Sequence, residues 1–187
     1  MQKRSVTVFC GSRAGKLPDY LTEAAELGKS LAAKDITLVY GGGNKGMMGE
    51  IANNCLANGG KVIGIIPKIL LKWEAQHEGL SELIVVEDMH ERKKLLYELG
   101  DSAVVMPGGN GTLDELFEML TWNTLNIHNK KIMLLNTGGF YDHLIAHMQT
   151  MLEQEYLYSD WRERLVVCNT AAEIISALLA DTPQNPL

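Results

Sequence analysis

The sequence predicts an α/β fold, a Rossmann-like doubly wound parallel sheet with helices on both faces. Short apolar runs alternate with longer segments of helical periodicity along the whole chain. Strand and helix alternation of this kind requires crossover connections, which make neighbouring strands parallel. With 187 residues, of which 46% are hydrophobic, the chain is large enough for one core. We therefore expect a single domain at 1–180, followed by a tail at 181–187.

Each predicted strand is an apolar run that stops at a glycine, a proline or a capping residue. The strands are expected at 6–10, 37–40, 61–66, 83–86, 103–106, 131–135 and 165–167. The helices are expected at 18–34, 47–58, 88–99, 112–126, 141–154 and 170–179. Pro18 suits a first helical turn, Asp88 and Thr170 suit N-caps, and Gly59 suits a helix end. Segment 68–81 shows no clear period, so no element is predicted there.

Charge and cysteine usage limit the possible partners and compartment. The formal net charge is −6, which argues against a nucleic-acid partner but allows a small phosphorylated ligand. The N-terminus lacks a signal peptide, and no apolar run could span a bilayer. The three cysteines, Cys10, Cys55 and Cys168, are widely spaced and read as reduced, buried thiols. These features favour a cytoplasmic protein without a membrane partner.

The stretch 103–115 is the strongest candidate for a functional site. A buried strand is followed by Pro-Gly-Gly-Asn-Gly and then by a helix start. Such a turn points free N–H groups and the positive end of the helix dipole at one spot, which suits an anion. Glu115 lies beside that spot. An alternative remains open, because Thr112 and Glu115 also have the spacing of a capping box. Thr170 and Glu173 share this spacing without a glycine loop, and we interpret that pair as capping only.

Two further clusters lie at the carboxyl ends of predicted strands. Loop 41–46 contains G-x-G-x-x-G, but it follows the second strand and lacks the later acidic residue of a NAD site, so it indicates phosphate binding only. Segment 88–94 places Arg92 and Lys93 near a helix N-terminus, where the dipole disfavours cations. They fit either a solvated helix start or an anion site.

Other chemistry-bearing residues have simpler explanations. Cys10 could be a nucleophile, but no histidine neighbours it in sequence, and a buried thiol is favoured. His143 and His147 have helical metal-pair spacing, yet no third ligand is evident, so no metal site is predicted. The helix at 112–126 is apolar on more than one face, which makes a homodimer interface plausible.

Four ordered motifs resemble those of the LOG (Lonely Guy) family, whose members are cytokinin riboside 5′-monophosphate phosphoribohydrolases long labelled possible lysine decarboxylases. The motifs are Phe-Cys-Gly-Ser at 9–12, Gly-Gly-Gly-Asn-Lys-Gly-Met-Met-Gly at 41–49, Asp-Met-His-Glu-Arg-Lys at 88–93 and Pro-Gly-Gly-Asn-Gly-Thr-Leu-Asp-Glu at 107–115. The resemblance covers about 6–179. Three residues depart from the family pattern: Met47 replaces Leu, Asn110 replaces a common aromatic residue and Arg13 replaces Ser.

The resemblance implies a Rossmann-like homodimer that hydrolyses the N-glycosidic bond of (N6-substituted) adenosine 5′-monophosphates, releasing the base and ribose 5-phosphate. It implies Arg92 and Glu115 as the catalytic pair, with no cofactor. The predicted substrate contacts are Gly11, Ser12, Gly42, Gly43, Glu74, Met89, Lys93, Gly108, Gly109, Asn110, Gly111, Thr112 and Thr121. A carboxylate below the sugar would stabilise an oxocarbenium-like transition state, and Arg92 would keep it ionised. The alternative function is a nucleotide-sensing module without catalysis.

Overall fold

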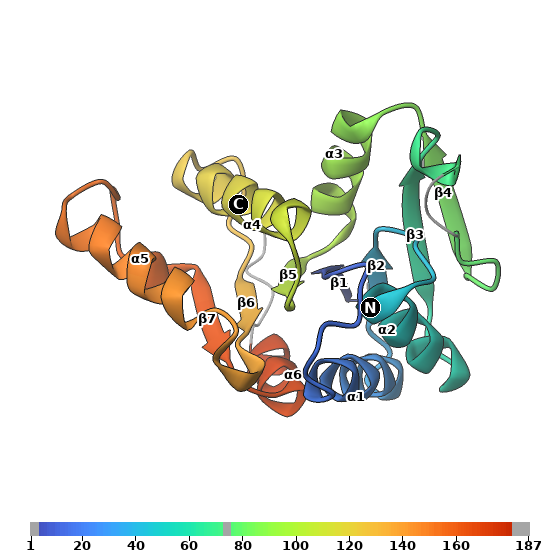
Figure 1. The fold of residues 1–187 in the computed structure, drawn as a ribbon. Coiled ribbons are helices and arrows are strands. Elements are labelled where there is room, and N and C mark those ends of the chain that lie inside the picture. The colour runs from blue at the N-terminus through green and yellow to red at the C-terminus, as the bar shows by residue number, and fades with distance from the viewer. Residues whose placement is uncertain (1–3, 73–75, 181–187) are drawn as a thin grey trace.

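The computed structural model describes residues 4–72 and 76–180, and these ranges contain one seven-stranded, all-parallel sheet (Figure 1). Its strand order is β4-β3-β2-β1-β5-β6-β7. The strands are β1 (Ser5–Phe9), β2 (Thr37–Tyr40), β3 (Val62–Pro67), β4 (Glu82–Val86), β5 (Ser102–Val105), β6 (Ile132–Leu135) and β7 (Leu165–Cys168). The predicted fold class is confirmed.

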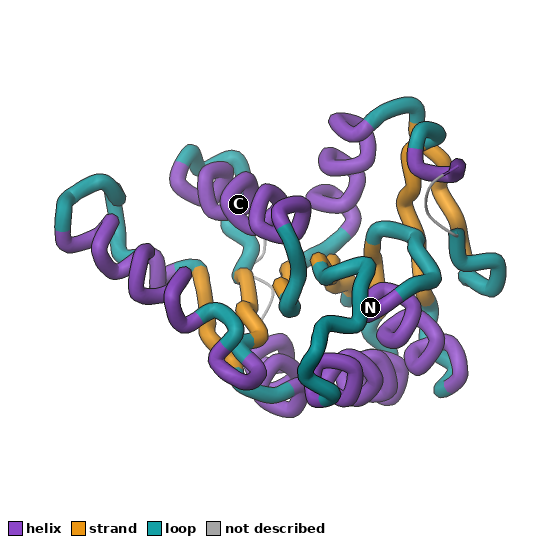
Figure 2. Tube along the Cα trace, in the orientation of Figure 1, coloured by secondary structure: helices purple, strands orange, loops and turns teal. Residues whose placement is uncertain are grey.

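Helices cover both faces of the sheet, as Figure 2 shows. They are α1 (Asp19–Ala33), α2 (Gly46–Ala57), α3 (Met89–Leu99), α4 (Asn110–Thr124), α5 (Asp142–Glu153) and α6 (Ala171–Ala180). One apolar core lies between the sheet and helices α1, α2 and α6, and it includes strand residues such as Val8. The second apolar core lies between the sheet and helices α3, α4 and α5, and it includes strand residues such as Phe9. Because side chains alternate across a strand, two cores on opposite faces require strands that are apolar throughout.

The direction of winding reverses at β1. Strand β1 pairs with β2 on one side and with β5 on the other. In open parallel sheets, ligands bind beyond the carboxyl ends of the strands at such a reversal. The two loops that meet there are bonded together, since the Gly11 N–H donates to the Pro107 carbonyl at 3.0 Å and the Met106 N–H donates to the Phe9 carbonyl at 2.9 Å.

Differences from the predicted elements are small. Helix α4 begins at Asn110 instead of 112, because Gly109 is its extended N-cap residue. Three short 3-10 helices were not predicted, and they lie at Leu70–Lys72, Thr137–Gly139 and Trp161–Glu163. The predicted tail at 181–187 lies outside the described residues. Among the described residues, no helix combines the length and apolarity needed to cross a membrane.

Candidate active site

The N-terminus of α4 leaves its first backbone donors unpaired. The first bonded N–H in the helix is that of Leu113, which donates to the Gly109 carbonyl at 3.1 Å. The N–H groups of Asn110, Gly111 and Thr112 have no partner among the described residues, and no side chain caps the helix. The capping-box interpretation of Thr112 and Glu115 is therefore wrong: Thr112 lies inside the helix and is 4% exposed. Free donors at the positive end of a helix dipole suit an anionic ligand.

The glycines around this N-terminus have different roles. A Cβ atom at Gly108 would collide with the Thr112 side chain, so close packing explains that glycine. A Cβ atom at Gly109 or at Gly111 would meet no atom within 4 Å, and neither residue has a positive φ. Neither backbone conformation nor packing in the described chain therefore requires these two glycines. Open space next to free N–H groups lets a ligand approach the backbone closely.

Thr170 and Glu173 provide the contrasting case. The Thr170 hydroxyl accepts from the Glu173 N–H at 3.3 Å, and the Glu173 carboxylate accepts from the Asn169 N–H at 2.7 Å. The capping interpretation of this pair is confirmed. Asp88 likewise caps α3, because its carboxylate accepts from the N–H groups of His90 and Glu91, each at 2.9 Å.

Arg92 is a buried cation held by backbone carbonyls. It is 6% exposed, its Nε donates to the Ile65 carbonyl at 3.2 Å and its Nη2 donates to the Gly41 carbonyl at 3.1 Å. A Cβ atom on Gly41 would collide with this guanidinium. No carboxylate forms an ion pair with Arg92 within the described part of the chain. A buried guanidinium without a direct counter-ion is costly, so this position suits an anionic ligand.

Glu115 lies on the second turn of α4, and its charge interacts with the Arg92 guanidinium and with Cys10, the residue after β1. Burial raises the pKa of Glu115 to about 7, and the Arg92 charge, which acts in the opposite direction, does not offset burial. Arg92 therefore favours the ionised acid, as predicted, but its effect on the pKa is smaller than that of burial. After burial, the Glu115 charge is the second cause that raises the pKa of the Cys10 thiol. The charges of Glu115 and Arg92 interact at the carboxyl edge of the sheet, and their role as a catalytic pair stays a prediction.

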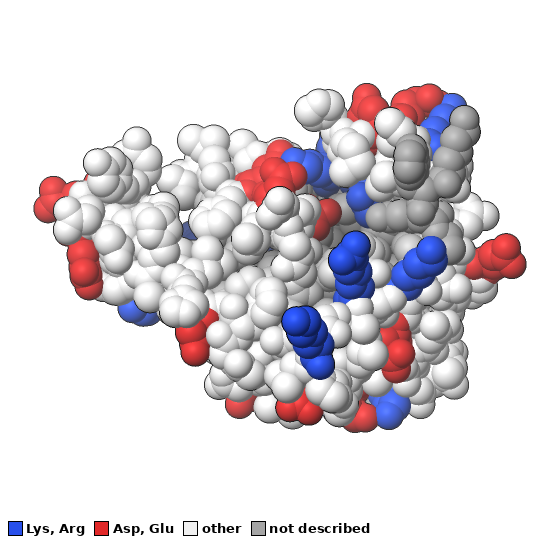
Figure 3. All heavy atoms as spheres, viewed as in Figure 1, with Lys and Arg blue, Asp and Glu red and all other residues white. Residues whose placement is uncertain are grey.

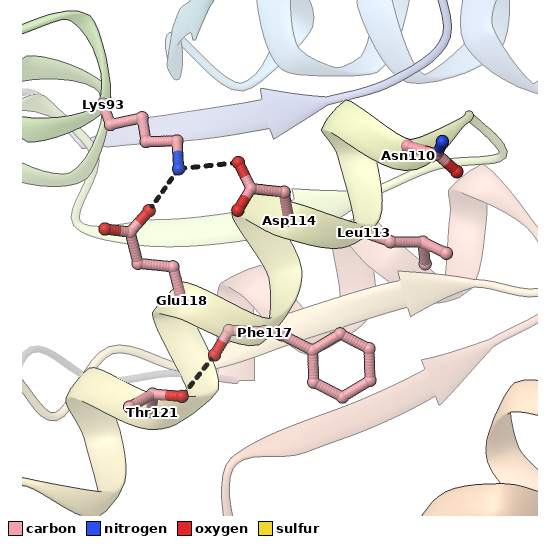
Figure 4. A pocket seen from close by; sticks show the side chains of 7 residues that line it. All are labelled: Lys93, Asn110, Leu113, Asp114, Phe117, Glu118 and Thr121. Carbon is pink, nitrogen blue, oxygen red and sulfur yellow. Dashed lines mark hydrogen bonds and ion pairs between the residues drawn. The ribbon is translucent and has the colours of Figure 1, made fainter. Parts of the chain in front are cut away.

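Lys93 points at α4 instead of the glycine loops. Its ammonium pairs with Asp114 at 2.6 Å and with Glu118 at 2.9 Å, as Figure 4 shows. These residues border an open hollow of about 500 Å³ on the outer face of α4. The hollow is lined by Lys93, Asn110, Leu113, Asp114, Phe117, Glu118 and Thr121. This hollow and the α4 N-terminus are adjacent but separate features.

The predicted substrate contacts do not all meet at one place. Gly11, Gly108, Gly109, Asn110, Gly111 and Thr112 surround the start of α4, and Ser12 and Met89 are exposed on the same edge. Gly42 and Gly43 are buried, and their carbonyls accept from the His77 N–H and the Tyr40 hydroxyl. Thr121 is eleven residues further along α4 than Asn110, roughly 16 Å at the helical rise. Glu74 lies outside the described residues.

Basic side chains surround the carboxyl-edge loops. Arg13, Lys16 and Lys45 are exposed on the loops that follow β1 and β2, and loop 11–15 packs against Gly46. Figure 3 shows Lys and Arg side chains gathered on this side of the molecule. Local positive charge on a chain of net charge −6 favours an anionic ligand at this edge.

Two supporting residues were missed by the sequence analysis. The Tyr141 hydroxyl donates to the Met106 carbonyl at 2.7 Å, just before the Pro-Gly-Gly turn. His77 is buried and contacts loop 41–46. Both act through contacts distant in sequence, which no local motif reveals. His143 and His147 are exposed, and the described residues contain no group of three or more potential metal ligands. All three cysteines are unpaired and buried, as predicted.

Comparison with known proteins agrees with this geometry. Residues 48–178 match the family model described as "Possible lysine decarboxylase", the label long used for LOG proteins. The chain belongs to the LOG family. A cytokinin riboside 5′-monophosphate phosphoribohydrolase of Rhodococcoides fascians is 42% identical over 176 residues, covering 94% of this chain and 89% of that protein. One from Arabidopsis thaliana is 41% identical over 181 residues, covering 95% and 84%.

Several solved structures have the same fold as this LOG protein. A molybdenum cofactor binding protein of Rippkaea orientalis superposes with a TM-score of 0.74 at 20% identity, covering 96% of this chain and 98% of that one. The molybdenum cofactor carrier protein of Chlamydomonas reinhardtii gives 0.72 at 21% identity, covering 96% and 97%. At these identities the likeness concerns the fold alone.

Proposed function

We propose that this LOG-family chain hydrolyses the N-glycosidic bond of adenosine-type 5′-monophosphates, including N6-substituted cytokinin nucleotides, and releases the free base and ribose 5-phosphate. The observation that carries the proposal is the position of Glu115: a half-buried acid on the helix whose first N–H groups are unpaired, with a charge that interacts with the Arg92 guanidinium. An anion site alone would bind a phosphate. Glycosidic cleavage also requires a carboxylate that stabilises the positive charge on the sugar, and Glu115 supplies one. The curated relatives are named for this reaction.

The described residues divide the work between binding and chemistry. The N–H groups of Asn110, Gly111 and Thr112 hold the 5′-phosphate, which fixes the position of the sugar. The ionised form of Glu115 stabilises the positive charge that develops on the sugar and orients the attacking water. Arg92 adds a fixed positive charge that favours this ionised form and the bound phosphate. The sensor alternative requires the anion site but assigns no task to the Glu115 carboxylate.

The lysine decarboxylase label fits the site poorly. Pyridoxal-dependent decarboxylation uses a lysine that forms a Schiff base, for which the amine must lose its proton. Lys93 is the lysine adjacent to Glu115. Burial lowers its pKa, but the ion pairs with Asp114 and Glu118 outweigh burial and raise the pKa above its ordinary value. This ammonium therefore stays charged, and the site favours glycosidic hydrolysis.

The decisive experiment incubates the purified protein with AMP and with N6-isopentenyl-AMP, and follows free base by chromatography. We expect release of the base from at least one substrate, together with ribose 5-phosphate in equal amount. The matching nucleosides, which lack the phosphate, serve as controls and should react poorly because they cannot use the α4 N-terminus. Nucleotide binding without release of any base would identify a sensor.

We also propose that the protein works as a homodimer through the outer face of α4. Leu113 and Phe117 line the open hollow there, and Leu125 is 63% exposed at the end of the helix. Apolar side chains of this kind on one helix face mark interaction surfaces. Thr121, predicted to contact substrate, lies on this face and too far along α4 to reach the N-terminus of its own helix. A second copy packed here would bring Thr121 close to a neighbouring site.

Sedimentation equilibrium tests the dimer. We expect twice the chain mass of 20.7 kDa for the wild type. Phe117→Glu should sediment as a monomer, because it places a charge in an apolar contact. Leu179→Glu is the matched control: Leu179 is 45% exposed but lies on α6, on the opposite face of the sheet (Figure 1), so the mass should not change. A monomeric wild type would refute the proposal.

A further inference from the structure

His77 is a buried histidine outside the catalytic pair and outside every motif. It is 6% exposed and lies between η1 (Leu70–Lys72) and β4. Its Nδ1 accepts from the Gly79 N–H at 3.0 Å, and its Nε2 lies 2.9 Å from Asn53 Oδ1 on α2. Since a backbone N–H can only donate, Nδ1 carries no proton, and Nε2 donates to Asn53. The contacts select one neutral tautomer of the ring.

The backbone of the same segment holds the glycine turn at 41–43. The His77 N–H donates to the Gly42 carbonyl at 3.0 Å, and Gln76 forms an antiparallel bridge with Gly43. Gly42 has φ +77°, a conformation that side-chain-bearing residues rarely adopt, so the turn relies on its contacts to stay in place. The preceding carbonyl, that of Gly41, accepts from Arg92. Adjacent carbonyls of one turn thus face His77 and Arg92.

We propose that His77 is a positioning residue for the reaction: its ring anchors segment 76–79 to α2, so that the segment holds the glycine turn in the conformation that orients the Arg92 guanidinium. The proposal rests on the proposed function, because it gives Arg92 a catalytic task. His77 itself does not contact the catalytic pair in the structure. Its influence passes from the ring to its own backbone, then to Gly42, Gly41 and Arg92.

The anchor depends on the protonation state of the ring. A proton on Nδ1 would face the Gly79 N–H, which places two donors against each other. Burial lowers the pKa of His77, and its own backbone bond opposes that shift. The charged side chains that the structure describes on α2, on segment 76–79 and on β4 are Glu50, Glu78 and Glu82, and Glu82 pairs with Lys61. None of them is among the causes of the shift. The anchor is intact above the ordinary histidine pKa and is lost as the pH falls through the lowered pKa.

The test compares His77→Ala with Asn53→Ala, which removes the acceptor at an exposed helix position. We expect His77→Ala to lower kcat about tenfold, with KM changed less than about threefold, because the orientation of a transition-state group is lost. Asn53→Ala should act in the same direction, and the double variant should lose less than the sum. The controls are Asn54→Ala, which removes the neighbouring amide on α2, and His143→Ala, which removes an exposed histidine; both should match the wild type.

The pH profile separates positioning from simple loss of stability. The ratio of wild-type to His77→Ala rates should fall from about ten at alkaline pH toward one in acid, because protonation opens the anchor in the wild type only. A constant ratio across this range would overturn the proposal. Hydrogen exchange supplies a readout independent of catalysis: His77→Ala should speed exchange of the amides at 41–46 and 79 without affecting 108–113.

The outcomes of these measurements are distinct. Faster exchange at 41–46 with an unchanged kcat would show a structural contact only and would overturn the positioning role. Unchanged exchange would overturn the anchor itself. If the wild type releases no base, the proposed function fails first; the exchange measurement then still decides whether His77 holds the glycine turn, and AMP affinity decides whether the turn affects the ligand.

Discussion

Glu115→Gln is expected to lower turnover about 10³-fold or more while nucleotide affinity stays within a few-fold. The amide keeps the shape of the side chain but cannot carry the negative charge that stabilises an oxocarbenium-like sugar. The proposed phosphate site does not include this side chain, because it consists of the unpaired backbone N–H groups on the preceding turn of α4. Single-turnover assays give the rate, and calorimetry with AMP gives the affinity. An unchanged rate would assign the chemistry to another residue.

The matched control is Glu173→Gln, which changes the other Thr-x-x-Glu sequence of the chain. That residue caps α6 at the end of β7, which lies two strands away from β5 in the sheet, so activity should not change. The pKa of Glu115, about 7, also predicts how kcat depends on pH. If the ionised acid is the active form, wild-type kcat falls as the pH drops through about 7.

Because the pKa of the Glu115 carboxyl is raised, the contribution of this group to stability is present at low pH and lost as the pH rises. At pH 8, Glu115→Gln should therefore be more stable than the wild type, by up to about 3 kcal/mol.

Gly41→Ala is expected to reduce kcat/KM about 100-fold, although it adds only one methyl group. The new Cβ atom would occupy the space of the Arg92 guanidinium, and Gly41 has no positive φ that would forbid alanine. Arg92 must then leave the Gly41 carbonyl, and small displacements of catalytic groups cost rates of this order. Steady-state kinetics on the proposed substrates measures the loss.

Two comparisons isolate the effect on Arg92. Gly60→Ala crowds Cys55 and Ala32 at a distance from the site, so it should lower stability to a similar degree and leave activity intact. Arg92→Gln should lose about as much activity as Gly41→Ala, and the double variant should lose little more, because both changes remove the same positioned guanidinium. Full additivity of the two losses would show that Gly41 acts in another way.

The sequence could predict the sheet, because each strand is an apolar run bounded by glycine, proline or a cap, and such boundaries are local. It also predicts Glu115 and Arg92 as the catalytic pair, since both lie in distinctive motifs, and the kinetics proposed above test that assignment. It misjudged Thr112, because the spacing of a capping box does not reveal that Gly109 already ends the extended segment. It could not show that Arg92 is held by Gly41 and Ile65, or that His77 contacts Gly42, because those partners are 27 to 51 residues away. Tertiary packing, which no local pattern encodes, determines those contacts.

The position of β1 between β2 and β5 also determines when the protein gains its activity during synthesis. A nascent chain that has emerged from the ribosome only as far as β4 possesses the glycine turn of β2 but neither Arg92 nor Glu115. A chain that ends before α4 therefore lacks both members of the proposed catalytic pair or has Arg92 alone. Because a ligand stabilises only the state that binds it, we expect nucleotide to protect completed molecules from proteolysis and to leave products truncated before α4 unprotected.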